Sequence, residues 1–308
     1  MNLVIYTVTF NPSIDYIVQL DNFKIGNLNK PIEDYKFPGG KGINVSRVLN
    51  NLGVKNKALG FIGGFTGKYV VDFLEDEGVA TDFIVVDGDT RINVKIKSKE
   101  ETEINAPGPE IKEKYLLKLI NKIHSLQADS FIVLAGNVQS SLPSNAYGQI
   151  MKSSKNNKDF IIDAVGQVLL ESLQYKPLLV KPNKEELEDL FQVKIDSLEE
   201  AVFYGKKLLT LGAQNVIVSL GKEGALLLNN EMECYASAPV GKAVNTVGAG
   251  DSLIAGFLRK YVEVKNILEA FRYGVAAGSA TAFSMDLCKK NEVEKLLSQV
   301  KLKEIKYN

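Results

Sequence analysis

Short apolar runs alternate with amphipathic segments along most of the chain, and this alternation constrains the fold more than any other feature. The runs expected as strands are residues 3–9, 57–62, 83–86, 130–135, 159–163, 178–181 and 215–219. Apolar side chains at helical spacing lie between them, at residues 42–52, 66–77, 110–126, 143–155, 184–191 and 198–211, and three more helices are expected in residues 249–300. The pattern predicts a three-layer α/β fold whose doubly wound sheet is mainly parallel and covered on both faces.

Two pairs of segments depart from this pattern. Residues 15–20 with 30–36, and residues 91–97 with 101–105, alternate apolar and polar side chains. A period of two is typical of strands with one buried face and one exposed face. We therefore expect a small accessory sheet, inserted at about residues 12–37 and 87–106 into a single domain of residues 1–308.

Composition excludes several classes of function. Lysine plus arginine and aspartate plus glutamate are balanced at 37 each, so no bulk positive field attracts nucleic acid or an anionic membrane. No stretch approaches 18 apolar residues, and the N-terminal residues predict a strand rather than a signal peptide. Two cysteines, Cys234 and Cys288, suit a reducing compartment, and we expect a cytoplasmic protein that binds neither nucleic acid nor membrane.

The chain has a single histidine, His124, within a helical pattern, and we interpret it as a surface or packing residue. A Ser-His-Asp hydrolase or a histidine-rich zinc site would depend on that residue alone. The Gly-x₄-Gly-Lys-Ser/Thr phosphate loop is absent, and the dinucleotide fingerprint is absent after the first strand. Catalysis is therefore expected to depend on carboxylates, lysines, glycine backbone and a bound metal.

Residues 245–256, Asn-Thr-Val-Gly-Ala-Gly-Asp-Ser-Leu-Ile-Ala-Gly, combine a small-residue loop with the start of a helix. Backbone N–H groups at a helix N-terminus bind anions, and glycines let the main chain approach a ligand closely. Asp251 falls in the first turn, where its carboxylate could accept a proton from an alcohol. Phosphoryl transfer to a hydroxyl group is one interpretation. The alternative is an ordinary glycine-rich loop with Asp251 as the helix N-cap.

A second loop of this kind lies near the N-terminus. Residues 37–53 read Phe-Pro-Gly-Gly-Lys-Gly-Ile-Asn-Val-Ser-Arg-Val-Leu-Asn-Asn-Leu-Gly, in which glycines again precede an amphipathic helix. Lys41 offers a point positive charge for a phosphate, and Asn44 offers a donor and an acceptor to a sugar hydroxyl. A tight turn with a solvated lysine is the alternative interpretation. Two such loops about 200 residues apart favour a phosphate and sugar site.

These two segments resemble the two signature motifs of the ribokinase-like sugar kinases, the phosphofructokinase B family. Residues 11–15 (Asn-Pro-Ser-Ile-Asp), 181–186 (Lys-Pro-Asn-Lys-Glu-Glu) and 218–224 (Val-Ser-Leu-Gly-Lys-Glu-Gly) follow in the family's order, so the resemblance spans essentially the whole chain. It implies a ribokinase-like fold in which the accessory sheet is a lid over the sugar, often shared between two subunits. A homodimer through the lid is therefore expected.

The resemblance implies a role for each loop. It implies that Asp251 is the catalytic base, kept ionised by the helix N-terminus, and that the N–H groups of residues 247–250 form an anion hole: Val247, Gly248, Ala249 and Gly250. Lys41 and Arg91 are candidates for the phosphate that the substrate already carries, since arginine and lysine both form charge-assisted bonds to phosphate. The remaining candidates for the sugar are Asp15, Gly40, Asn44 and Asn105.

A second group of residues is expected on the nucleotide side. Asn183 and Glu186 fit the family's Asn-x-x-Glu motif, which helps to organise Mg²⁺ through water. The same spacing also makes a helix capping box, and both interpretations can hold. The candidates for ATP are Lys181, Asn183, Ser219, Gly221, Gly224, Ala277 and Gly278. Asn245 stands where many ribokinases have an aspartate, so we do not predict a monovalent cation site.

Residues 102–109, Thr-Glu-Ile-Asn-Ala-Pro-Gly-Pro, together with the two loops, resemble the branch of the family that acts on phosphorylated ketohexoses. This resemblance implies ATP- and Mg²⁺-dependent phosphorylation of D-fructose 1-phosphate at its 6-hydroxyl. A kinase of tagatose 6-phosphate is the alternative within the class. A non-catalytic sensor of nucleotide or sugar phosphate is the alternative outside it, and the retention of Lys41, Asp251 and the Gly-Ala-Gly loop argues against a sensor.

Overall fold

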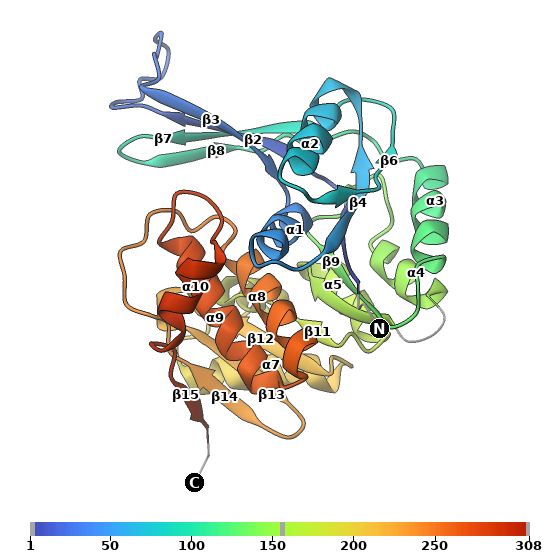
Figure 1. Cartoon of the computed structure of the whole chain (residues 1–308), viewed down its shortest axis with the longest axis vertical. Helices are drawn as coiled ribbons and strands as arrows, with labels where there is room; N and C mark the ends of the chain where they lie inside the picture. Colours follow the sequence, from blue (N-terminus) through green and yellow to red (C-terminus); the bar gives the residue numbers. More distant parts are fainter. Residues whose placement is uncertain (1–3, 155–157, 306–308) are drawn as a thin grey trace.

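The computed structural model describes residues 4–154 and 158–305 and contains one large sheet and one small sheet (Figure 1). The main sheet follows the order β15-β14-β13-β12-β11-β10-β9-β1-β4-β5, and β6 pairs with β4. Its bounds are β1 Ile5–Thr9, β4 Asn56–Ile62, β5 Ala80–Thr81, β6 Ile84–Val85, β9 Ser130–Ala135, β10 Lys158–Asp163, β11 Leu179–Val180, β12 Asn215–Ser219, β13 Ala225–Asn229, β14 Glu233–Ala236 and β15 Leu302–Glu304.

The strands from β5 to β12 pair in parallel, as the alternation of strands and helices predicts. The edge strands β13, β14 and β15 are antiparallel and were not expected from the sequence. The first residue of the expected strand 3–9 and the last residue of the expected helix 143–155 lie outside the described residues. The mainly parallel α/β sheet is therefore confirmed, with an antiparallel extension at one edge.

Helices cover both faces of the main sheet (Figure 1). One layer contains α3 Glu113–His124, α4 Ala146–Ser153, α5 Gly166–Leu173, α6 Lys184–Phe191 and α7 Leu198–Thr210. The opposite layer contains α1 Lys41–Asn51, α8 Ala249–Val264, α9 Ile267–Ala282 and α10 Lys290–Leu297. The additional helix α2, Gly64–Asp76, packs beside α1, and a 3₁₀ turn spans Gly221–Glu223. The three C-terminal helices expected in residues 249–300 are confirmed, whereas α5 was not predicted.

The main core lies on the two faces of the sheet because successive strand side chains point in opposite directions. In β9, Phe131 and Val133 pack against the layer that contains α8, whereas Ile132 and Leu134 pack against the layer that contains α3. All four are at most 1% exposed. A strand buried on both faces needs an apolar residue at every position, which is why the sequence shows a continuous run here rather than alternation.

The small sheet forms an arm that projects from the main body in Figure 1. Its order is β3-β2-β7-β8, with bounds β2 Ser13–Gln19, β3 Glu33–Gly39, β7 Arg91–Lys97 and β8 Glu101–Ile104. The outer pairs are antiparallel, and β2 runs parallel to β7. Strands β2, β7 and β8 fall within the expected insertions of residues 12–37 and 87–106, whereas β3 extends to Gly39, two residues beyond the first insertion. We call this sheet the lid. A small cluster that includes Ile14 and Ile43 packs the base of the lid against α1.

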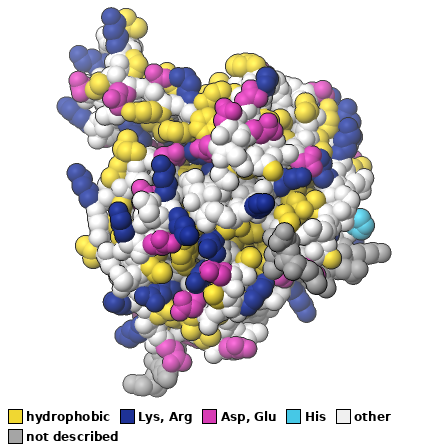
Figure 2. Space-filling model, viewed as in Figure 1, with side chains coloured by type: hydrophobic (Ala, Val, Ile, Leu, Met, Phe, Trp, Pro, Cys, Tyr) yellow, Lys and Arg dark blue, Asp and Glu magenta, His cyan; other side chains and the backbone are white. Residues whose placement is uncertain are grey.

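The surface carries no single dominant charge. Figure 2 shows lysine and arginine side chains scattered among aspartate and glutamate over this face, in keeping with the balance of 37 and 37.

His124 ends α3, is exposed, and its Nδ1 lies 2.7 Å from the Ser153 carbonyl oxygen. Cys234 and Cys288 are free and buried. Among the described residues, no helix has both the length and the apolar character that crossing a membrane requires.

Helices α8 and α9 approach each other closely because glycines lie at their contact. A Cβ atom added to Gly274 would lie 2.7 Å from the Leu253 carbonyl oxygen, and one added to Gly256 would lie 2.6 Å from the Ala277 Cβ. Such a contact leaves no room for a methyl group. The close packing matters for function because α8 starts at the loop of residues 245–250.

We predict that Gly274→Ala lowers the free energy of unfolding by about 1–2 kcal/mol. Overpacking of a filled interface costs about 1–3 kcal/mol, and the helix propensity of alanine returns up to about 1 kcal/mol. The measurement is chemical denaturation, with Ser279→Ala, half-buried on the same helix, as the matched control. A more stable Gly274→Ala variant would contradict the close contact.

Candidate functional site

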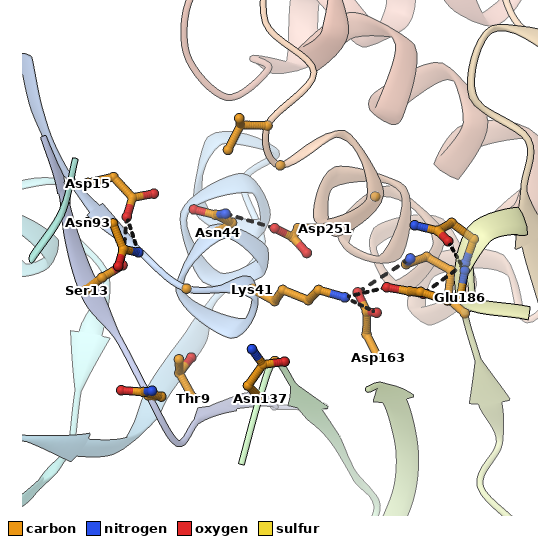
Figure 3. A pocket seen from close by; sticks show the side chains of 18 of the residues that line it. Thr9, Ser13, Asp15, Lys41, Asn44, Asn93, Asn137, Asp163, Glu186 and Asp251 are labelled. Atoms are coloured by element: carbon orange, nitrogen blue, oxygen red, sulfur yellow. Dashed lines mark hydrogen bonds and ion pairs between the residues drawn. The ribbon is translucent and has the colours of Figure 1, made fainter. Parts of the chain in front are cut away.

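A cavity of about 390 Å³ opens at the carboxyl ends of the parallel strands, between the lid and the start of α8. Residues that follow or end β1, β9, β10, β11 and β12 line it, together with the first residues of α1 (Figure 3). Ligands of open α/β sheets bind at this edge. The two sequence loops, about 200 residues apart, therefore meet at one cavity.

Most of the predicted site residues line this cavity. They are Asp15, Gly40, Lys41, Asn44, Arg91, Lys181, Asn183, Glu186, Ser219, Val247, Gly248, Gly250 and Asp251. The remaining predicted residues lie outside the lining and are treated separately below. The lining also contains residues that were not predicted, namely Thr9, Asn11, Ser13, Asn93, Gly136, Asn137 and Asp163.

Asp251 lies in the first turn of α8, and its side chain points into the cavity (Figure 3). Its Oδ2 accepts a hydrogen bond of 2.8 Å from the Asn44 Nδ2, so the carboxylate is tied to the loop–helix motif of α1. The helix N-cap is Gly248, with φ +79°, and makes no side-chain capping bond. The interpretation of Asp251 as an N-cap residue is therefore wrong, and its carboxylate is available for chemistry.

Burial and the neighbouring charge of Asp163 together raise the pKa of Asp251 to about 6, against the opposing effects of Lys41, Asn44 and Lys181. The helix N-terminus was expected to keep Asp251 ionised. The burial of this residue, which is 6% exposed, and the Asp163 carboxylate both act against that effect. A carboxylate with this raised pKa is a stronger base than an ordinary aspartate and is still mostly ionised at neutral pH.

The loop before α8 presents backbone N–H groups to the cavity, but it uses two of the four predicted ones itself. The Val247 N–H donates to the Asn245 Oδ1 at 3.3 Å, and the Ala249 N–H donates to the Thr246 carbonyl at 3.2 Å. Within the described part of the chain, the N–H groups of Gly248 and Gly250 have no such partner. These two are the best placed for an anion.

Lys41 extends from the start of α1 across the cavity to two carboxylates (Figure 3). Its Nζ lies 2.9 Å from the Asp163 Oδ1 and 3.2 Å from the Glu186 Oε1. Burial alone would lower the pKa of Lys41, but Asp163, Glu186 and Asp251 outweigh burial and raise it. The ammonium group is therefore charged, and in this structure it faces the two carboxylates. The expected role of Lys41 with Arg91 on the phosphate of the substrate stays a prediction.

Asp163, at the end of β10, is 1% exposed and lies between two lysines. Lys181 approaches its Oδ2 at 3.5 Å, from the residue that follows β11. Burial would raise the pKa of Asp163, but Lys181 and Lys41 outweigh it and lower the pKa. The Lys181 Nζ also lies 3.2 Å from the position of a Cβ on Gly250, so the missing side chain of Gly250 lets this charge approach the anion loop.

Asn183 and Glu186 form a capping box at the start of α6. The Asn183 Oδ1 accepts from the Glu186 N–H at 2.6 Å, and the Glu186 Oε2 accepts from the Asn183 N–H at 2.9 Å. The capping interpretation is confirmed. Because the Glu186 Oε1 also faces Lys41 inside the cavity, the same residue caps the helix and brings a negative charge to the site.

The lid end of the cavity is built around Asp15. Its Oδ1 accepts hydrogen bonds from the Ser13 hydroxyl at 2.7 Å and from the Asn93 Nδ2 at 3.1 Å. The Lys95 ammonium lies 3.6 Å from its Oδ2. A Cβ on Gly39 would lie 2.5 Å from this carboxylate, so a glycine is required behind it. Asp15 is thus held in one orientation on β2, where it can accept from a hydroxyl group.

Arg91, at the start of β7, is bound to backbone at the base of the lid. Its Nη1 donates to the Ala106 carbonyl and its Nη2 to the Asn11 carbonyl, each at 3.1 Å. Burial lowers the pKa of its guanidinium, and Asp15 opposes this effect. The Nε is buried and has no hydrogen-bond partner among residues 4–154 and 158–305. One donor of Arg91 therefore still lacks a partner beside the cavity.

Three oxygen acceptors in the cavity lining are also buried without a hydrogen-bond partner among the described residues. Among the described residues, the Thr9 Oγ1, the Asn11 Oδ1 and the Asn93 Oδ1 are buried without a hydrogen-bond partner, and all three residues line the cavity. Buried polar atoms are nearly always bonded in folded proteins. Unpartnered acceptors in residues that line the cavity indicate a ligand that brings several hydroxyl donors, as a sugar does.

The other predicted residues lie outside the cavity lining. Asn105 is exposed and donates to the Glu103 Oε2 at 3.3 Å. Gly221 begins the 3₁₀ turn that comes after Ser219, and Gly224 follows that turn. Ala277 and Gly278 are buried in α9 against α8, where a Cβ on Gly278 would lie 2.9 Å from the Ala249 carbonyl oxygen. In this structure these two positions serve helix packing.

Two central residues, Asp163 and Asn93, were missed by the sequence analysis. For Asp163 a signal existed, because an aspartate at the carboxyl end of a buried parallel strand lies at the ligand-binding edge. For Asn93 there was none, because asparagine within an alternating strand also fits a solvent-facing position. Only the pairing of β7 with β2, in which Asn93 lies opposite Asp15, shows its role.

The chain was compared with known protein families. Residues 8–293 match the profile described as pfkB family carbohydrate kinase. The chain belongs to the PfkB family of carbohydrate kinases. The match covers most of the chain and includes both signature loops and the lid.

Individual PfkB relatives are similar over nearly full length. The 1-phosphofructokinase of Bacillus subtilis is 50% identical over 97% of this chain and 99% of its own. The D-tagatose-1-phosphate kinase of Bacillus licheniformis is 39% identical over the same shares, 97% and 99%. The crystal structure of Escherichia coli phosphofructokinase-2 with fructose-6-phosphate superposes with a TM-score of 0.90 at 28% identity, covering 96% of this chain and 99% of that one. The PfkB fold expected from the sequence is confirmed.

We predict that Asp251→Asn raises the melting temperature of the ligand-free protein at pH 8. An aspartate with a folded pKa of about 6 and an unfolded value of about 3.9 destabilises the fold when charged. Between the two pKa values the folded protein binds more protons than the unfolded protein does. The loss of folding stability caused by the charged Asp251 is therefore complete above about pH 6 and disappears towards pH 4. The rise in melting temperature caused by Asp251→Asn should therefore become smaller as the pH falls from about 6 to about 4.

Thermal unfolding between pH 5 and pH 8 measures this gain. Asp189→Asn, an exposed aspartate of α6, is the matched control and should show no such dependence. A melting temperature of Asp251→Asn below that of the native protein at pH 8 would show that the Asn44 bond outweighs the penalty of burial.

Proposed function

We propose that this PfkB kinase transfers the γ-phosphoryl group of ATP to the 6-hydroxyl of D-fructose 1-phosphate, which gives fructose 1,6-bisphosphate. The observation that carries the proposal is the placement of one buried carboxylate, Asp251, beside an anion loop at one end of the cavity, with hydroxyl acceptors at the other end. The 50% identity to a 1-phosphofructokinase over nearly the full chain supports the choice of sugar.

In this proposal, the acceptor sugar lies between the lid and Asp251. Asp15 and Asn93 accept hydrogen bonds from ring hydroxyls, and the unpartnered Arg91 Nε contributes to binding of the existing phosphate. The 6-hydroxyl then lies next to Asp251, which takes its proton as the phosphoryl group transfers. Asn44 holds the Asp251 carboxylate in position through its 2.8 Å hydrogen bond.

The nucleotide phosphates lie against the loop before α8. The N–H groups of Gly248 and Gly250 bind phosphate oxygens, and Lys181 adds a buried positive charge beside Gly250. The nucleotide itself extends from Ser219 towards the turn that contains Gly221 and Gly224. Preorganised donors of this kind stabilise the charge that develops on the transferred group.

Magnesium fits the residues present. The Asp163 Oδ1 and the Glu186 Oε1 both lie within hydrogen-bond distance of the Lys41 Nζ, at 2.9 Å and 3.2 Å, so two carboxylate oxygens face one position in the cavity. Mg²⁺ prefers carboxylate oxygens and keeps several waters, so Asp163 and Glu186 would hold it, with Asn183 in the surrounding shell. When bound, the metal neutralises phosphoryl oxygens of the nucleotide.

D-Tagatose 1-phosphate is a second candidate substrate, because a relative with that name is 39% identical over nearly the full chain. Tagatose and fructose differ only in the configuration at carbon 4, so both place a primary 6-hydroxyl beside Asp251. The tagatose 6-phosphate expected as an alternative from the sequence carries its phosphate at the opposite end. The higher identity to the 1-phosphofructokinase favours the fructose substrate.

We also propose a cytoplasmic homodimer that forms through the lid. The lid and its connecting loop expose large apolar side chains, namely Ile25, Leu28, Ile32, Ile92 and Ile104. Exposed apolar patches mark interaction surfaces. The two free, buried cysteines support a reducing compartment.

We predict that kcat/KM for D-fructose 1-phosphate exceeds that for fructose 6-phosphate and tagatose 6-phosphate by at least about tenfold, a difference of about 1.4 kcal/mol. The experiment is ADP release with ATP and Mg²⁺ over a panel of sugar phosphates that includes D-tagatose 1-phosphate. A clear preference for a 6-phosphate would overturn the choice of substrate. ATP hydrolysis without any accepted sugar would favour the sensor alternative.

Asp251→Asn should lower kcat by about 10²–10⁴-fold, the range for loss of a general base, while KM for both substrates changes little. Asparagine keeps the shape of the side chain and a partner for Asn44. Steady-state kinetics with Asp189→Asn as the control tests this. Near-native turnover in the folded variant would remove Asp251 from the role of base.

A further inference from the structure

Two lysines share the Asp163 carboxylate, but they are held very differently. Lys181 is 4% exposed and lies 3.5 Å from the Asp163 Oδ2. Lys41 is 32% exposed and lies 2.9 Å from the Asp163 Oδ1. Lys181 is thus enclosed by protein, whereas Lys41 extends into the cavity on a flexible four-carbon stem. If Lys41 left, Lys181 would still neutralise the buried carboxylate.

The Lys41 ammonium occupies the position that suits a divalent cation. It bridges the Asp163 Oδ1 and the Glu186 Oε1, at 2.9 Å and 3.2 Å. These are the carboxylates that would hold magnesium, which sits about 2.0–2.1 Å from its oxygen ligands. Two cations that share the same pair of oxygens would repel each other strongly in this partly buried cavity. The lysine and the metal therefore compete for one position.

We propose, on the basis of the kinase function above, that Lys41 is an exchangeable counter-ion. In the ligand-free enzyme its ammonium holds the position between Asp163 and Glu186 that the magnesium of the nucleotide takes on binding. The released side chain of Lys41 then contacts the phosphoryl group under transfer. This differs from the role beside Arg91 on the substrate's existing phosphate that the sequence suggested.

The surroundings of Lys41 provide a second position for its charge. Its stem crosses the cavity on the side of Asp251 in Figure 3, and Asp251 is among the charges that act on it. The space between Asp251 and the loop of Gly248 and Gly250 is where the phosphoryl group passes from nucleotide to alcohol. A lysine freed from the carboxylates would bring a positive charge to this space at the moment when the phosphates arrive.

Metal binding to the protein without nucleotide and sugar tests the competition directly. We use Mn²⁺ as the probe, because it takes the same oxygen ligands as Mg²⁺ and its free ion is measured by electron paramagnetic resonance. Lys41→Met removes the competing charge but keeps an unbranched side chain. It should bind Mn²⁺ at least about tenfold more tightly than the native protein, the lower end for one charge-assisted contact.

Two further variants make the result specific. Lys112→Met removes an exposed lysine that is paired with Asp87 away from the cavity, and it should bind Mn²⁺ as the native protein does. Adding Glu186→Gln to the Lys41→Met variant should abolish the increase in Mn²⁺ affinity. Glutamine keeps the capping bond to the Asn183 N–H but loses the negative charge. Thermal unfolding confirms that each variant is folded.

The outcomes separate this proposal from the proposed function. Equal or weaker Mn²⁺ binding by folded Lys41→Met, or a gain that survives Glu186→Gln, would overturn the exchange. Neither result depends on the sugar, whereas the identity of the substrate is decided by turnover of the native enzyme. In kinetics, Lys41→Met should lower kcat more than it raises KM for the sugar phosphate. A rise in KM alone would instead place Lys41 on the acceptor.

Discussion

The site depends on one costly feature, a carboxylate buried at the edge of the main sheet. Asp163 is 1% exposed, and a charge so far from water requires positive partners. Lys41 is the first residue of α1, and Lys181 follows β11, so the ion pairs connect three separate parts of the chain. The same carboxylate raises the pKa of Asp251 and thereby adjusts the proposed base. Structure and chemistry are linked through this one charge.

The cavity divides into two ends with different chemistry. The lid end carries Asp15 and unpartnered oxygen acceptors, which suit a polyol, and the unpartnered Arg91 Nε, which suits a phosphate on that polyol. The opposite end carries backbone N–H groups, Lys181 and the Asp163–Glu186 pair, which suit phosphates and a divalent cation. Asp251 lies between them and is held by Asn44. This separation means that either end can be altered without removing the other, which is consistent with relatives that carry different sugar names.

Much of the fold and of the site follows from local sequence patterns. The buried strands are recognised in the sequence as continuous apolar runs, and β9 and β12 have the bounds that the runs predict. Asp251, Asn44 and Lys41 are identified because each lies within a glycine-rich segment at the start of a helix. The short edge strands β13–β15 and helix α5 escape prediction, since brief apolar segments do not distinguish a strand from a helix or a loop. Asn93 escapes because its partner, Asp15, is 78 residues away in the sequence.

The sequence by itself determined which segments become strands and helices, and that two glycine-rich loops precede two of the helices, because these properties depend on neighbouring residues. Only the tertiary structure decided where the charges point. Lys41 faces Asp163 and Glu186 rather than Arg91, and Ala277 packs against α8 rather than lining the cavity. Side-chain direction and burial depend on residues far apart in the chain that meet only when the sheet assembles. For the same reason the raised pKa of Asp251, which depends on its enclosure and on Asp163, exists only in the folded protein.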